Sequence, residues 1–156
     1  MTDDRFGFEL PLLLVGAFRA LVDDLHDRLA ERGHPAARPI HGFALQALGS
    51  GGTTITDLGR RLGVSKQAAA KTVIGLEHLE YVERRRNPHD RRAALIRRTS
   101  RGDELLALSA EVFEGLRERW ICELGVDRVR GLESDLERIS ANVKGSKLGD
   151  LSGWLR

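Results

Sequence analysis

Two groups of side chains near the middle of the chain have the chemistry to bind nucleic acid. In the first, Lys66, Gln67, Ala70 and Lys71 lie within six residues. Lysine reaches phosphates and guanine acceptors, glutamine offers the paired donor and acceptor that adenine matches, and a small alanine allows close approach or contact with a thymine methyl group. These residue types predict a helix face that reads the major groove of DNA.

The second group is a cluster of arginines around a turn. Asn87-Pro88-His89-Asp90 has turn chemistry, and the flanking segments 81–86 and 93–99 are short and partly β-branched, which predicts a β-hairpin. Arginines at a hairpin tip suit a narrow minor groove, where the negative potential is strongest. Asp90 is placed to hold Arg92 through a bidentate pair. A charged edge hairpin that resists aggregation is the alternative, but it would not require charge of one sign.

The elements that must position these groups can be predicted locally. Thr54 and Asp57 form a capping-box pattern at the start of a short helix, and Gly63 ends that helix. Ser65 can cap a second helix, predicted over residues 66–80, whose core-facing residues would be Ala69, Val73, Leu76 and Leu79. Two helices joined by a tight glycine-containing turn predict a helix-turn-helix. A solvated amphipathic helix is the alternative.

Three motifs in this segment are similar to those of one known family. The motifs are LGVS, LEHLEYVERR and NPHDRRAALIRRTSRG, and together they resemble the MarR family of bacterial transcription regulators. Asp90-Arg91-Arg92 corresponds to the family's Asp-x-Arg wing element, and the segment 99–102 to its T-x-x-G start of the next helix. Gly59, where alanine is usual, and the alanine-rich front of the second helix depart from the family pattern.

The resemblance implies a winged helix-turn-helix that works as an intertwined homodimer, with DNA affinity modulated by a small aromatic or phenolic molecule. The predicted function is a sequence-specific transcription regulator, with repression as the expected outcome. The predicted DNA-binding residues are Thr54, Ser65, Lys66, Gln67, Ala70, Lys71, Arg84, Arg86, Asp90, Arg91 and Arg92. The predicted ligand-binding residues are Phe18, His41, Phe43, Leu106 and Phe113, although apolar residues at helical spacing are usually core.

The rest of the chain is predicted to be helical, so the fold class is mainly α with a small β-hairpin wing. Helices are expected over residues 9–32, 40–48, 100–124 and 127–143, with Ser100 and Asp103 as a capping box for the third. In the second, Ile40, Phe43, Ala44 and Ala47 are expected to face inward. The predicted single domain has four parts: dimerisation and support helices (1–49), the DNA-binding module (50–101), C-terminal dimerisation helices (102–143) and a tail (144–156).

The apolar character of the two terminal helical regions favours a dimer. The first half of the N-terminal helix is apolar almost all round, and Val129, Leu132, Leu136, Ile139 and Val143 step by three and four residues along the last helix. An intramolecular helical hairpin is the alternative. An isologous dimer would bury both regions more easily.

Charge is segregated along the chain. Residues 54–101 carry 12 Lys/Arg against 5 Asp/Glu, whereas the remainder carries 13 against 18, so the formal net charge is only +2. Positive charge is therefore concentrated on the predicted DNA-facing module. A composition of 41% hydrophobic and 31% charged residues predicts a folded, soluble chain.

Other functional classes have weaker support. One cysteine, and no signal segment or span long enough for a bilayer, predict a cytoplasmic protein without a membrane partner. Cys122 as a redox sensor and a winged helix that binds only protein are kept as alternatives. The five histidines show no metal-ligand spacing, and no phosphate loop, nucleophile elbow or HExxH occurs, so no metal, cofactor or enzyme activity is predicted.

Overall fold

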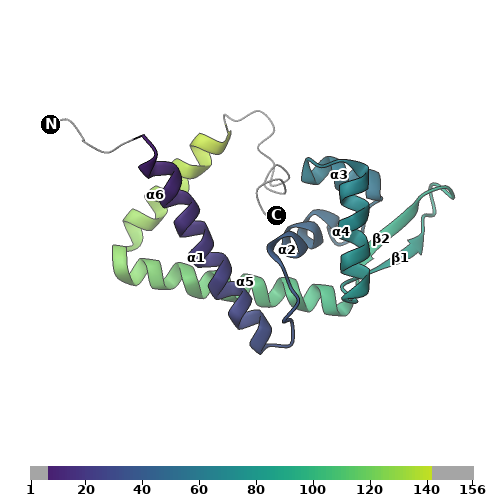
Figure 1. Ribbon diagram of the computed structural model, residues 1–156, viewed down its shortest axis with the longest axis horizontal. Coiled ribbons are helices and arrows are strands. Elements are labelled where there is room, and N and C mark those ends of the chain that lie inside the picture. Colours follow the sequence, from purple (N-terminus) through teal and green to yellow (C-terminus); the bar gives the residue numbers. More distant parts are fainter. Residues whose placement is uncertain (1–6, 142–156) are drawn as a thin grey trace.

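The computed structural model describes residues 7–141 (Figure 1). In chain order the elements are α1 (Glu9–Glu31), α2 (Pro39–Leu48), α3 (Ile55–Leu62), α4 (Lys66–His78), β1 (Val82–Arg86), β2 (Ala94–Arg98), α5 (Ser100–Leu124) and α6 (Val126–Ala141). The predicted fold class, mainly α with a β-hairpin wing, is confirmed. The predicted tail, 144–156, and Val143 lie outside the described residues.

The long helices and the small module occupy opposite parts of the molecule (Figure 1). In one part of the molecule α1 crosses the middle of α5, while α2, α3, α4 and the hairpin gather in the other part. Helix α5 spans both parts, because its first turn packs against the base of the hairpin and its middle packs on α1. Helix α5 therefore connects the long helices to the hairpin.

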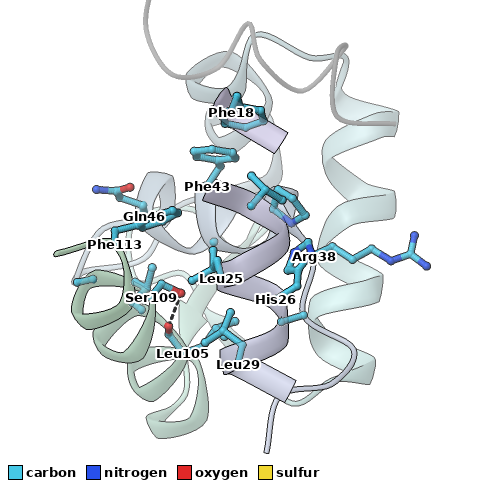
Figure 2. Close-up of a pocket in the computed structure, with 16 residues that line it drawn as sticks. Phe18, Leu25, His26, Leu29, Arg38, Phe43, Gln46, Leu105, Ser109 and Phe113 are labelled. Atoms are coloured by element: carbon cyan, nitrogen blue, oxygen red, sulfur yellow. Dashed lines mark hydrogen bonds between the residues drawn. The ribbon is translucent and has the colours of Figure 1, made fainter. Parts of the chain in front are cut away.

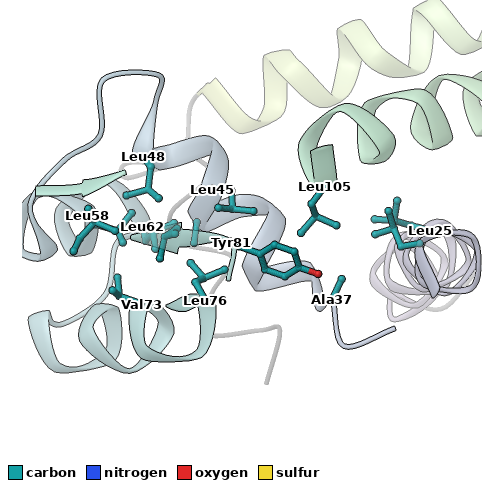
Figure 3. Close-up of a cluster of buried hydrophobic side chains, with 14 residues drawn as sticks. Leu25, Ala37, Leu45, Leu48, Leu58, Leu62, Val73, Leu76, Tyr81 and Leu105 are labelled. Carbon is teal, nitrogen blue, oxygen red and sulfur yellow. The ribbon is translucent and has the colours of Figure 1, made fainter. Parts of the chain in front are cut away.

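The hydrophobic core joins α2, α3, α4 and the hairpin, and it extends along α5 to α1 (Figure 3). Tyr81, between α4 and β1, is 1% exposed and lies between the two parts of this core. The buried residues include Leu25, Leu29, Leu45, Leu48, Leu58, Leu62, Val73, Leu76, Ile96 and Leu105. One continuous core thus fixes the helix-turn-helix relative to the long helices.

The predicted local signals of the helix-turn-helix are present in the structure. Thr54 Oγ1 accepts a hydrogen bond from the Asp57 backbone N–H at 3.2 Å, and Ser65 Oγ accepts one from Ala68 at 3.2 Å. Gly63 ends α3 in the left-handed region, with φ of 65°. These local signals fix where α3 begins and ends and where α4 begins.

Three boundary or face predictions were wrong. Helix α4 ends at His78 rather than residue 80, and Glu80 takes a positive φ of 61°. Thr99, not Ser100, caps α5, because its Oγ1 accepts from the Gly102 N–H at 3.1 Å. In α2 the buried face consists of His41, Ala44, Leu45 and Leu48, whereas Ile40, Phe43 and Ala47 are only partly buried. The docking of α2 on the core, which periodicity could not fix, sets that face.

Two apolar surfaces of the long helices are exposed in the single chain. On α1, Leu10, Leu12, Leu13 and Val15 are each more than half exposed. On α6, Ile139 is 66% exposed and Leu132 and Leu136 about 40%, while Val129 is buried. Such contiguous apolar surface is unusual on a monomeric protein. Among the described residues, no helix is long and apolar enough to span a membrane.

Candidate functional site

The exposed face of α4 contains the side chains predicted to contact DNA. Lys66, Gln67 and Lys71 are exposed and Ala70 is partly buried, whereas Ala69 lies in the core. The N-terminal half of α4 therefore presents two positive charges and one amide on a surface of small residues. Short alanines lie between the long side chains there, which would let a groove wall approach the helix closely.

The two capping residues, Thr54 and Ser65, sit at the N-termini of α3 and α4. Each hydroxyl accepts a backbone N–H in the first turn of its helix, and Thr54 Oγ1 also donates to Asp57 Oδ2 at 3.0 Å. Ser65 is exposed and Thr54 partly buried. A helix N-terminus carries partial positive charge, so both positions suit a nearby phosphate.

The hairpin tip is shaped by two side chains that bond to nearby backbone. Asn87 Oδ1 accepts from the His89 N–H at 2.9 Å, and Asp90 Oδ1 accepts from the Arg92 N–H at 2.8 Å. The predicted bidentate pair between Asp90 and the Arg92 guanidinium is therefore wrong, because the carboxylate is engaged by the backbone. Asn87, which is 9% exposed, was missed as a brace, although an Asn two residues before a loop amide is a known turn signal.

The arginines of the hairpin differ in their surroundings. Arg91 and Arg92 are exposed at the tip, and Arg86 is exposed near the end of β1. Within residues 7–141, the side chains of these three make no hydrogen bond or ion pair with the protein. Arg84 instead pairs with Glu77 of α4, at 2.8 and 3.0 Å. Of the predicted wing residues, the structure thus leaves three arginines available to a ligand and engages the fourth.

A pocket of about 320 Å³ lies between α1, α2 and α5 (Figure 2). Four of the five predicted ligand-binding residues line it, and three of them are aromatic: Phe18, Phe43, Leu106 and Phe113. Their gathering in one cavity comes from the crossing of α1 over α5, with α2 closing one side. His41 does not line the pocket, which corrects its predicted place.

The pocket also contains polar groups that the sequence did not single out. His26, Arg38, Gln46 and Ser109 contribute to its wall. Ser109 Oγ donates to the Leu105 carbonyl at 2.7 Å, while His26 Nε2 is buried without a hydrogen-bond partner among the described residues. A buried polar atom without a partner is rare and favours a site that accepts a polar group. These four residues could not be selected from the sequence, because apolar periodicity picks out apolar positions and each of these is a polar residue among apolar ones.

His41 is 8% exposed, and its Nδ1 accepts from the Arg38 backbone N–H at 3.2 Å. Burial, assisted by the nearby Arg38 guanidinium, lowers the pKa of His41 from 6.5 to about 4. As the pH falls below 6.5, His41 of the unfolded chain therefore binds a proton, whereas His41 of the folded chain stays neutral until the pH approaches about 4. We expect the free energy of unfolding to drop by about 2 kcal/mol from about pH 7.5 to about pH 5 through this group.

Urea unfolding of the wild type and His41→Gln at a series of pH values checks this expectation. The wild type should lose stability relative to His41→Gln as the pH falls towards the lowered pKa, because only the wild type has this titrating group. Parallel pH profiles would mean that His41 titrates normally in the folded state.

A second buried histidine connects the long helices to the base of the hairpin. His34 Nδ1 lies 2.9 Å from Tyr81 Oη, and burial lowers the pKa of His34. The Arg101 guanidinium lies over the Tyr81 ring at 5.5 Å and donates to the Gly33 carbonyl at 2.9 Å. The link between α1 and α2, which contains Gly33 and His34, is thereby attached to Tyr81, the residue before β1.

The remaining chemical candidates have less support. Cys122, near the end of α5, is an exposed free thiol. Among the residues that the structure describes, no cluster of histidine, cysteine and carboxylate side chains could hold a metal ion. In the part of the chain that the structure describes, the basic surface and the aromatic pocket therefore have the best support as ligand-binding features.

Comparison with known proteins gives a family match over part of the chain and a fold over most of it. Residues 38–93 match the model of the MarR family. The reduced form of MarR from E. coli is 21% identical, with a TM-score of 0.70 over 86% of this chain and 98% of that one. YusO from Bacillus subtilis is 17% identical, with a TM-score of 0.67 over 92% and 100%. A mutant of E. coli MarR complexed with operator DNA is 20% identical, with a TM-score of 0.69 over 86% and 99%. No curated protein matches the chain.

Proposed function

We propose, from the premise that this chain is a MarR-family winged-helix protein, that it regulates transcription by binding a pseudo-palindromic DNA site as a homodimer. The observation that carries the proposal is the placement of Lys66, Gln67 and Lys71 on the exposed face of α4, beside a hairpin tipped by Arg91 and Arg92. A helix face for the major groove and an arginine tip for the minor groove lie on one rigid module. A protein of this fold in complex with operator DNA adds support.

The dimer is proposed from the apolar surfaces of α1 and α6. Two copies of the chain related by a two-fold axis would cover both surfaces with one isologous contact. Their two α4 helices should then lie about 34 Å apart, which is the distance between successive major grooves on one side of the duplex. The site in DNA should accordingly contain two inverted half-sites.

Control by a small molecule is proposed for the pocket between α1, α2 and α5. A cavity of about 320 Å³ with three phenylalanine rings suits one small aromatic molecule, such as a phenol. A molecule held there would contact both the long helices and α2, which packs on the helix-turn-helix. It can change DNA affinity only if it prefers one arrangement of these parts. If the bound molecule lowers the affinity for the operator, the protein acts as a repressor that its ligand releases from DNA. Its proposed location is the cytoplasm.

Selection of bound fragments from the source genome, followed by a gel-shift assay over a range of salt concentrations, tests the main proposal. Specific binding that weakens steeply with salt is expected, because neutralised phosphates release counterions. Absence of salt-dependent duplex binding would instead favour a winged helix that binds only protein.

Arg92→Ala should lower the affinity for every duplex and reduce the slope of log affinity against log salt by about one. Its exposed guanidinium has no partner in the described protein, so the loss would come from the DNA contact. Gln67→Ala is the contrasting variant, because it should relax preference at one base pair by about 1–3 kcal/mol. Unchanged binding by Arg92→Ala would remove the wing tip from the interface.

A further inference from the structure

A bidentate ion pair joins α4 to the wing. Arg84 Nε lies 2.8 Å from Glu77 Oε1, and Arg84 Nη2 lies 3.0 Å from Glu77 Oε2. Glu77 is in the last turn of α4, and Arg84 is the middle residue of β1. The Glu77 side chain is 29% exposed and the Arg84 side chain 42%, so the pair is accessible to solvent on one side. Two parallel bonds between planar groups fix orientation as well as distance.

The register of the hairpin explains why Arg84 reaches α4. Arg84 is opposite Ile96, and directly opposed residues of an antiparallel pair point to the same face. Ile96 is fully buried, so this is the face that packs on the module. Glu83 and Arg85 point to the opposite face, where Arg85 Nε bonds to Glu83 Oε1 at 2.7 Å. Strand alternation therefore separates Arg84 from its two neighbours.

The charge of Arg84 is already compensated within the protein. Glu77 raises the pKa of Arg84 through the paired hydrogen bonds, so the arginine stays protonated while held. Arg91 and Arg92 at the tip, by contrast, have no side-chain partner within the described part of the chain. Two of the five N–H donors of Arg84 are engaged by Glu77 and its charge is paired, whereas the tip arginines offer all five donors and an unpaired charge to a phosphate.

We propose that Glu77 and Arg84 are positioning residues, which fix the wing relative to α4 so that the tip and the helix face reach their grooves together. This inference rests on the proposed DNA binding and replaces the expected direct contact of Arg84 with DNA. An exposed ion pair contributes little to folding stability, so its effect should fall on geometry. A wing already held in place loses less freedom when the protein binds.

The direction in which Glu77→Gln changes the DNA affinity distinguishes a positioning role of the pair from a direct contact of Arg84 with DNA. Glu77→Gln removes a negative charge near DNA, so it should raise the affinity if only electrostatics matters. If the pair positions the wing, Glu77→Gln should instead lower the affinity by about tenfold, within the range of couplings between contacting residues. Glu83→Gln is the matched control, because Glu83 pairs with Arg85 on the other face and does not reach α4.

A double-mutant cycle and a charge swap complete the DNA measurement. Arg84→Gln should resemble Glu77→Gln, and the double variant E77Q/R84Q should bind no worse than either single variant. The swap E77R/R84E should restore part of the affinity. Loss of binding in Arg84→Gln together with a gain in Glu77→Gln would overturn the proposal, because Arg84 would then contact DNA directly.

A measurement without DNA distinguishes failure of this inference from failure of the proposed function. Backbone ¹⁵N order parameters of residues 82–98 should fall in Glu77→Gln and Arg84→Gln but not in Glu83→Gln, while thermal unfolding remains close to wild type. Unchanged order parameters would overturn the positioning role, whatever the DNA result. If the wild type binds no DNA, the proposed function fails, and the order parameters still decide whether the pair holds the wing.

Discussion

Leu13→Glu is expected to convert the protein to a monomer and to weaken binding to a two-half-site operator by about 100-fold or more. Leu13 is 61% exposed in the single chain, among neighbours on α1 that are equally apolar and exposed. A carboxylate there would have to be buried without a partner at the proposed dimer contact, which costs several kcal/mol. Each separated subunit would retain one α4 and one wing, and so only single-site affinity.

Sedimentation equilibrium and a gel-shift assay with one-half-site and two-half-site duplexes measure the two parts of this expectation. Ala30→Glu, on an exposed position in the last turns of α1, is the matched control and should remain dimeric. Binding to the single half-site should be similar in Leu13→Glu and the wild type. A dimeric Leu13→Glu with normal operator affinity would exclude this part of α1 from the subunit contact.

Gly102→Ala is expected to lower the free energy of unfolding by about 3 kcal/mol. A Cβ at Gly102 would lie 2.2 Å from the Tyr81 carbonyl oxygen and 3.4 Å from Leu45 Cδ2. The first turn of α5 approaches this backbone so closely because Thr99 bonds to it twice: its N–H donates to the Tyr81 carbonyl, and its Oγ1 donates to the Glu80 carbonyl at 2.6 Å. Alanine must therefore separate α5 from the base of the wing.

The same helix offers a matched control for Gly102→Ala. Gly115 has no atom within 4 Å of its would-be Cβ, so Gly115→Ala should stabilise the helix by up to about 1 kcal/mol. Urea unfolding at one fixed protein concentration compares the two variants, since the stability of an oligomer depends on concentration. Equal stability of Gly102→Ala and the wild type would mean that α5 can move away from Tyr81 at little cost. The wing would then be only loosely attached to the long helices.

The sequence was most informative where structure depends on neighbouring residues. Thr54, Ser65 and Gly63 act within a few residues of their own positions, and the helix-turn-helix they predict is confirmed. The charged hairpin was likewise predicted from its turn residues and short flanking segments, and its strands are confirmed. Four of the five ligand-binding candidates meet in one pocket because α1, α2 and α5 each present an apolar face to the others.

What the sequence did not provide is the direction in which individual polar side chains point. Arg84 belongs to a run of three arginines, and only its pairing opposite the buried Ile96 turns it towards Glu77. Asp90 bonds to a backbone amide instead of the Arg92 guanidinium, because the turn brings the amide closer. His41 faces away from the pocket because α2 buries the side of the helix that contains Leu45.

The sequence alone determined the fold class, the approximate positions of the helices and the wing, and the segment in which positive charge is concentrated. Caps, turns and apolar periodicity are properties of short stretches, so they can be read without knowing the distant parts of the chain. Only the tertiary structure decided which arginines remain available at the wing and which one is held by α4. Those outcomes depend on strand register and helix docking, which arise from contacts between residues far apart in the sequence.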